Sequence, residues 1–248
     1  MLLYPLLRRM DGLPAIGVLN REFYLDAGVK PERIYWTPYS IDTRMFLEAK
    51  ITEEDRLREE EKIGLRPNSF RVIFCGKLIH LKRPYDIIEA VARMPSRESV
   101  EAVFVGDGEL MPMLKRLAEE KKVRAHFLGF RNQTELPLLY SLADVMSLPS
   151  GHEPWGLVIN EAMTMGLPAI VSDVVGCGPD LVIDGESGFI CPAGDVFAIS
   201  KALEKMASSP ELRQRLKKGA ADQQLQHGSN AAGLSPSNSW SGEAKVIH

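Results

Sequence analysis

A strand end, a loop and a helix start follow one another in Pro149-Ser150-Gly151-His152-Glu153-Pro154-Trp155-Gly156-Leu157-Val158-Ile159-Asn160-Glu161-Ala162. The apolar run 145–148 before it predicts a buried strand, and residues 157–165 predict a helix. Short apolar runs alternate with amphipathic segments from 71 to about 207, as parallel strands with crossover helices do. The sequence therefore predicts an α/β fold with a Rossmann-like, doubly wound parallel sheet.

The same alternation predicts the other elements of this sheet. The expected strands are 71–75, 101–106, 124–129, 168–172 and 188–191, and the expected helices are 84–94, 109–122, 135–143 and 196–206. A doubly wound sheet binds its ligands in loops beyond the carboxyl ends of the strands. The site residues should therefore lie in those loops.

The chain outside the repeating series divides into three further parts. Residues 1–50, with an expected strand at 13–19, a helix at 20–27 and a strand at 33–38, look like the remnant of a second α/β domain. Residues 51–69 contain a charged, helix-prone run that suits a connector helix between domains or an ordinary surface helix.

The main domain, which should carry the ligand site, is expected at 70–220 and a disordered tail at 221–248. The tail is rich in Gln, Ser, Asn and Gly, and from about Gln223 it offers little apolar surface to bury. We therefore expect no fixed structure there.

Composition and charge bear on the partners of the chain and on its cellular compartment. The chain has 248 residues and a net charge of -3, so it lacks the basic field that gathers nucleic acid. The apolar opening 1–7 precedes Arg8 and Arg9, the wrong order for a signal peptide, and is too short to span a bilayer. Three widely spaced cysteines favour a reducing compartment. We expect a cytoplasmic protein with no nucleic-acid partner.

The amino end of the helix that follows Gly156 is the strongest candidate for an anion site. The free N–H groups near Gly156, Leu157 and Val158, together with the helix dipole, would bind a diphosphate without a metal. Glu153 lies in the loop and Glu161 about one turn into the helix, so both can face one cleft and accept hydrogen bonds from sugar hydroxyls. An alternative for Glu161 is that the helix dipole alone favours an acid there.

Two further loops carry candidate residues. Lys77 and Lys82 follow the first strand of the sheet and would neutralise charge on a leaving diphosphate, although charges in a loop are commonly only solvated. Gly106 begins a tight turn that lacks the third glycine of a dinucleotide fingerprint. Phe130 could stack on a base, the alternative being a core phenylalanine.

Metal and cofactor signals are absent from the sequence. His80, His126 and His152 have no metal-ligand spacing, and no two aspartates are separated by one residue. Neither a nucleophile elbow nor a P-loop motif occurs. We therefore expect a metal-independent protein with no cofactor.

The motifs, taken in order, resemble the family 4 retaining glycosyltransferases with the GT-B fold, from about Ala15 through Lys218. The match consists of Gly76-Lys77 with Lys82, Gly106-Asp107-Gly108, Leu128-Gly129-Phe130, Ala143-Asp144-Val145 before Pro149-Ser150, and Glu153-Pro154-Trp155-Gly156-Leu157 with Glu161-Ala162.

This resemblance implies a role for each matched residue. Glu153 would contact the donor sugar, Glu161 the ribose hydroxyls, and Lys77 and Lys82 the diphosphate. The amides from Gly156 to Val158 would bind the sugar or the distal phosphate. Lys77 stands where the family more often has arginine, which keeps the charge and loses the bidentate fork.

The resemblance also implies a function and its partners. The parent enzyme would transfer a sugar from a nucleoside diphosphate sugar to an acceptor hydroxyl with retention of configuration, in glycan or polysaccharide biosynthesis. The family's long acceptor domain is represented only by residues 1–50, and its glycine-rich loop and histidine have no counterpart. A separate amino-terminal domain chain is therefore a candidate partner, and peripheral attachment to the cytoplasmic face of a membrane is common in the family. The acceptor is not identified.

Two other functions stay open at this stage. The chain could be a non-catalytic module that binds a nucleotide sugar and needs a partner chain. It could also be a GT-B sugar-nucleotide epimerase, which the glutamate pattern fits less well.

Overall fold

The computed structural model describes residues 3–39 and 41–232, with side chains as far as residue 227. Its main sheet has six strands in the order β5-β4-β3-β6-β7-β8, and every neighbouring pair is parallel. This confirms the predicted α/β fold and doubly wound sheet. The strands are β3 (Phe70–Cys75), β4 (Val100–Val105), β5 (Arg124–Phe127), β6 (Val145–Leu148), β7 (Ala169–Ser172) and β8 (Gly188–Cys191).

Burial explains why these apolar runs form strands. All residues of the four central strands β3, β4, β6 and β7 are buried, because helices cover both faces of a parallel sheet. Strand β4 ends before Gly106, whose φ of 131° leaves the extended region. Strand β5 likewise ends before Gly129, whose φ is 68°. Both predicted strands were therefore slightly too long at their carboxyl ends.

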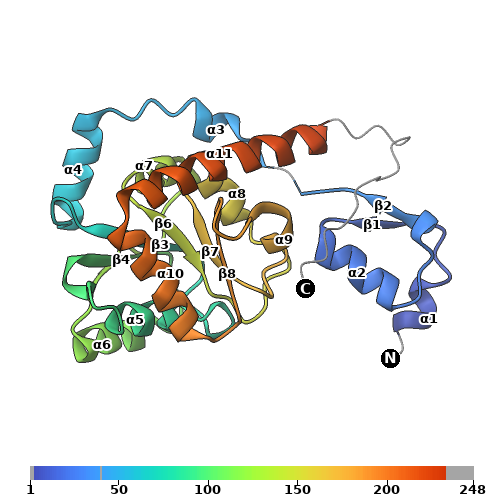
Figure 1. Ribbon diagram of the computed structural model, residues 1–248, viewed down its shortest axis with the longest axis horizontal. Coiled ribbons are helices and arrows are strands. Elements are labelled where there is room, and N and C mark those ends of the chain that lie inside the picture. Colours follow the sequence, from blue (N-terminus) through green and yellow to red (C-terminus); the bar gives the residue numbers. More distant parts are fainter. Residues whose placement is uncertain (1–2, 40, 233–248) are drawn as a thin grey trace.

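The helices of the main domain form two layers. Helix α5 contacts both α6 and α10, whereas α8 contacts β6, β7 and α11. Figure 1 shows α5, α6 and α10 in the lower part of the view and α7 and α8 in the upper part. Their bounds are α5 (Tyr85–Ala92), α6 (Met111–Lys121), α7 (Leu136–Ser141), α8 (Leu157–Thr164), α9 (Gly178–Leu181) and α10 (Val196–Ser208), with 3-10 turns η2 (His80–Lys82), η3 (Arg97–Ser99) and η4 (Gln133–Glu135).

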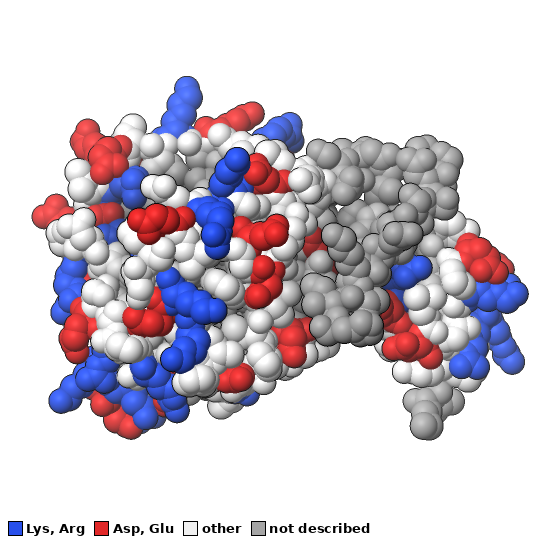
Figure 2. Space-filling model, in the orientation of Figure 1, with Lys and Arg blue, Asp and Glu red and all other residues white. Residues whose placement is uncertain are grey.

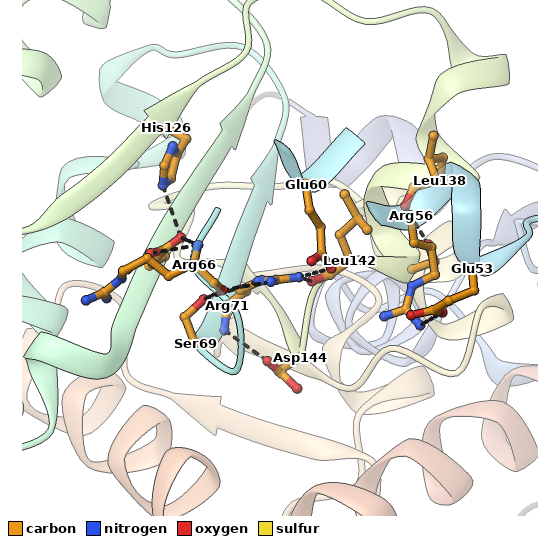
Figure 3. Close-up of polar contacts among 12 residues, drawn as sticks. Glu53, Arg56, Glu60, Arg66, Ser69, Arg71, His126, Leu138, Leu142 and Asp144 are labelled. Atoms are coloured by element: carbon orange, nitrogen blue, oxygen red, sulfur yellow. Dashed lines mark hydrogen bonds and ion pairs between the residues drawn. The ribbon is translucent and has the colours of Figure 1, made fainter. Parts of the chain in front are cut away.

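The predicted helix in 51–69 is α4 (Glu53–Ile63), preceded by α3 (Arg44–Leu47). Thr52 and Asp55 form a capping box at its start, and Gly64 ends it with a left-handed backbone. Arg71, buried at the start of β3, donates to Glu60 of α4 at 2.6 Å and to the Leu142 carbonyl at 3.2 Å (Figure 3). The helix is thus fastened to the main domain at one end.

Residues 3–39 form a small separate unit at the right of Figure 1. A two-stranded parallel sheet packs with two helices around a small apolar core. The predicted strand 13–19 is too long, because the strand ends at Ala15 and a helix begins at Val18. The Val18 N–H donates to the Asp180 carboxylate at 3.0 Å, from a residue far along the chain. The elements are α1 (Leu3–Leu7), β1 (Leu13–Ala15), α2 (Val18–Asp26), η1 (Pro31–Arg33) and β2 (Ile34–Trp36).

The predicted disordered tail is wrong for residues 221–232. Helix α11 (Pro210–Ala232) continues through them and contacts α8, α9 and α10, and it crosses the top of the main domain in Figure 1. Its buried stripe consists of Leu216, Ala220, Gln224 and His227. The stripe has helical spacing but ends in two polar residues, so apolar composition did not indicate it. The rest of the predicted tail, 233–248, lies outside the described residues.

No helix in 3–39 or 41–232 is long and apolar enough to cross a membrane. The same residues contain no group of three or more His, Cys, Asp or Glu side chains that could hold a metal ion.

Candidate functional site

The sheet reverses its direction of growth between β3 and β6. These strands are neighbours although β4 and β5 lie between them in the sequence. The chain leaves the carboxyl ends of such a pair in opposite directions and opens a crevice there. The loops that follow β3 and β6 are the ones that carry Lys77, Lys82, Glu153 and Gly156.

An ion pair joins these two loops. The ammonium of Lys82 donates to the Glu153 carboxylate, and both side chains are largely buried. A second link lies beside it, because the Gly151 N–H donates to the Leu81 carbonyl at 2.8 Å. The structure therefore brings together two of the three predicted catalytic residues, at the point where the topology expects a ligand.

Lys77, the third, is exposed in the loop after β3. Within the described part of the chain its ammonium has no hydrogen bond or ion pair, so its charge is available to a ligand. Its predicted contact with a diphosphate stays a prediction.

Helix α8 begins at the crevice with a glycine that the backbone requires. Gly156 has a φ of 100°, and a Cβ there would lie 3.1 Å from Leu148 and 3.2 Å from Val175. The helix leaves its first N–H groups without helical partners, and Leu157 is exposed at that end. Gly156, Leu157 and Val158 thus stand where an anion site was predicted, and their contact with a ligand stays a prediction.

Glu161 lies deeper, on the buried face of α8. The Tyr140 hydroxyl donates to its Oε2 at 2.9 Å, and the Gln133 amide lies 3.5 Å from its Oε1. Burial raises the pKa of Glu161, while the hydrogen bonds from Tyr140 and Gln133 lower it. Glu153 and Glu161 therefore face different partners, one a lysine and the other a tyrosine. The sequence interpretation named neither Tyr140 nor Gln133, because both come from another helix and turn.

Gly106 lets three loops pack closely. Its N–H donates to the Gly129 carbonyl at 2.8 Å, and a Cβ on it would lie 1.9 Å from the Gly76 carbonyl oxygen. The loops after β3, β4 and β5 therefore meet at this glycine. This packing explains why a glycine stands at that position. The predicted contact of Gly106 with the donor stays a prediction.

Phe130 stands on the surface beyond β5. Its side chain is 76% exposed, so the alternative of a core phenylalanine is wrong. The ring is free to meet a ligand, and its stacking on a base stays a prediction.

A buried network supports the loop before α8 from behind. The Trp155 indole N–H donates to the side-chain oxygen Oδ1 of Asn160 at 2.8 Å, and the Asn160 side-chain amide donates to Oε1 of Gln224 in α11 at 3.3 Å. The Trp155 ring also lies 5.7 Å from the Tyr39 ring. The loop that carries Glu153 is thus held by the carboxyl-terminal helix and touched by the amino-terminal unit. Sequence spacing alone did not indicate these contacts.

One protein family matches most of the chain. The model of "Glycosyl transferases group 1" matches residues 55–223. The alpha-D-kanosaminyltransferase of Streptomyces kanamyceticus is 32% identical over 198 residues, which are 79% of this chain and 50% of that protein. The N-acetyl-alpha-D-glucosaminyl L-malate synthase of Bacillus anthracis is 28% identical over 192 residues, with coverages of 76% and 48%. The chain spans about half the length of the curated relatives it matches.

Solved structures share the fold at lower sequence identity. The crystal structure of Anabaena HepE in complex with UDP superposes with a TM-score of 0.80 at 22% identity, covering 92% of this chain and 65% of that one. The structure of WaaG, a glycosyltransferase involved in lipopolysaccharide biosynthesis, gives 0.72 at 23% identity, with coverages of 90% and 63%.

Proposed function

The chain belongs to the group 1 family of glycosyl transferases, and from this membership we propose that it supplies the donor site for transfer of a sugar from a nucleoside diphosphate sugar to an acceptor hydroxyl, with retention of configuration. The GT-B fold expected from the motifs agrees with the solved neighbours. Anabaena HepE has been solved with UDP and with UDP-glucose, so a UDP-sugar is the first donor to test.

The Lys82–Glu153 ion pair at the sheet's reversal point carries the proposal. When the donor's glycosidic bond breaks, negative charge grows on the leaving diphosphate. Lys82, Lys77 and the first amides of α8 are the groups that stabilise it. These groups act without a metal.

The carboxylates bind hydroxyl groups in this scheme. Glu153 accepts hydrogen bonds from the donor sugar once its lysine turns to the diphosphate, and Glu161 accepts from the ribose. Neither needs to form a covalent intermediate, unlike the nucleophile of a retaining glycosidase.

Calorimetric titration of the chain with UDP, GDP and ADP, in the presence of a chelator, tests the donor site. We expect one nucleotide to bind and Glu161→Ala to weaken it, while Glu120→Ala on the surface of α6 leaves it unchanged. If Glu161→Ala binds the nucleotide as tightly as the parent does, Glu161 does not contact the ribose. Binding without transfer to any acceptor would favour the non-catalytic module.

The cellular location of the reaction is also part of the proposed function. We place the reaction in the cytoplasm, with attachment to the cytoplasmic face of a membrane as the arrangement to test. Fractionation of cells that express the parent protein, with and without high salt, distinguishes a peripheral from a freely diffusing enzyme.

A further inference from the structure

A cavity of about 510 Å³ lies at the other end of the sheet from the donor site. Its walls come from the segments that precede β3, β4 and β5, from strand β5 and from helix α6. Two carboxylates, Glu98 and Glu119, line it together with five cations: Arg66, Arg97, Lys115, Lys122 and Arg124. Because the whole chain carries a net charge of -3, this concentration of cations runs against the overall sign.

A buried carboxylate orients two of the cations. Glu101 has no exposed surface and lies 2.6 Å from Nε of Arg66 and 3.5 Å from Nε of Arg124. His126 also contacts it, at 3.2 Å, and Figure 3 shows Arg66 and His126 around this point. Even with Glu101 counted, five cations face three carboxylates. The Nη2 atom of Arg66 is buried and has no hydrogen-bond partner among the described residues, so a donor remains unmatched.

The other three cations are weakly engaged. Lys115 and Lys122 form no ion pair within 3–39 and 41–232, and the Lys115 ammonium lies 6.0 Å from the centre of the Phe127 ring. Arg97 pairs at 3.6 Å with Glu98 and donates to the Ala92 carbonyl at 3.4 Å, and the side chains of Arg97 and Glu98 are well exposed. Such surface pairs contribute little and exchange readily. All three side chains can therefore turn to an anion in the cavity.

Figure 2 shows where cations gather on one face of the molecule. Lys and Arg side chains are dense at the lower left, over the region that Figure 1 assigns to α5 and α6. An approaching anion is attracted to such a region before it makes specific contacts.

We propose that this cavity is a second anion site, which binds a small molecule bearing two or more phosphate groups. Guanidinium forks match phosphate oxygens in a bidentate way, and lysines add charge without directional demand. The cavity has the volume of a small-ligand site, and Arg66, Arg97 and Arg124 line it from three different segments. The site uses none of the residues assigned to the donor.

Inorganic pyrophosphate is the probe, and the backbone amide spectrum of the full chain is the readout. We expect saturable shifts at residues 97–98 and 122–127, in addition to any at 156–158. The same shifts at 122–127 should persist when Lys77→Gln and Lys82→Gln disable the donor site. Shifts confined to 156–158, or absent altogether, overturn the proposal.

Two neighbouring substitutions provide the matched test. Lys115→Gln removes a cation that lines the cavity, and Arg116→Gln removes an exposed cation of the same helix that does not. Lys115→Gln should weaken pyrophosphate binding at 122–127 by about threefold or more, as expected when one exposed ion contact is lost. Equal effects of the two substitutions would show that pyrophosphate is attracted to positive charge in general and would contradict a specific site.

The phosphate can come from a soluble metabolite or from a lipid headgroup. Co-sedimentation with phosphatidylcholine vesicles containing phosphatidic acid separates these sources. Binding that pyrophosphate displaces and Lys115→Gln weakens assigns the site to a headgroup, whereas pyrophosphate binding without vesicle binding assigns it to a soluble ligand.

Discussion

The ammonium of Lys82 is held by the carboxylate of Glu153, across the crevice where the sheet reverses direction. A phosphate that binds Lys82 must therefore compete with Glu153. The pair predicts opposite effects of its two members on the binding of a free nucleoside diphosphate.

Lys82→Gln should lower the affinity for the nucleoside diphosphate by roughly tenfold, because a charge contact worth about 1.4 kcal/mol is lost. Glu153→Gln should leave that affinity equal or higher, because the lysine is released, but lower the affinity for the nucleotide sugar. Calorimetry of both ligands with both variants measures this difference. A parallel loss for both ligands in Glu153→Gln would contradict the competition.

Tyr140→Phe should make nucleotide binding depend more strongly on pH than it does in the parent protein. Burial raises the pKa of Glu161 and the Tyr140 hydroxyl lowers it, so removal of the hydroxyl raises this pKa further. The protonated fraction of Glu161 then grows as the pH falls, and a protonated acid accepts fewer hydrogen bonds. Nucleotide affinity of the variant should drop more than that of the parent between about pH 8 and about pH 5. Identical pH profiles would remove Glu161 from the ribose contact.

The order of strands and helices in the main domain followed from the sequence because each element has a simple pattern. Strands β6 and β8 have the predicted bounds, and the other strands differ by a few residues at their ends. The loops after β3 and β6 could be placed at one edge because parallel strands end together. Residues that follow the same edge were therefore predicted to meet, as Lys82 and Glu153 do.

Contacts between distant segments could not be predicted in this way. Tyr140 approaches Glu161, and Asp180 accepts from Val18, only after the helices have packed. Helix α11 was missed because Gln224 and His227 occupy its buried stripe, and composition counts such residues as polar.

Gly106→Ala should destabilise the chain by about 2 kcal/mol or more. The new methyl would overlap the Gly76 carbonyl, and the backbone φ of 131° disfavours a side chain. Gly64→Ala is the matched control, with a φ of 81° and no atom within 4 Å of the added Cβ; it should cost about 1 kcal/mol from backbone strain alone. Urea unfolding of both variants measures the difference. Equal losses would mean that the close approach of the loops is not rigid.

Leu216→Ala should lower the free energy of unfolding by about 2–4 kcal/mol, because this side chain is fully buried on the face of α11 that packs against the main domain. Leu225→Ala, on the same helix with 60% exposure, should cost less than about 1 kcal/mol. Urea titration followed by circular dichroism measures both. If Leu216→Ala also weakened nucleotide binding, α11 would act on the loop before α8, through Gln224 and Asn160. A small loss in Leu216→Ala would contradict the packing of this helix.

Asp180 should make stability fall as pH rises through the weakly acidic range. Burial raises its pKa from 3.8 to about 6, against the opposing hydrogen bond from the Val18 N–H. The folded state therefore holds the proton more tightly than the unfolded state. The stability that this provides is complete below about pH 4 and is lost as the pH rises through about 6.

Asp180→Asn keeps an oxygen for Val18 and removes the charge, so it should be more stable than the parent at pH 7 by roughly 1–3 kcal/mol and nearly equal to it near pH 4. Asp42→Asn is the control, because Arg44 lowers the pKa of that exposed carboxyl instead. Urea unfolding across this range decides the point, and a gap between parent and Asp180→Asn that does not widen with pH would show that Asp180 is not buried against the amino-terminal unit in solution.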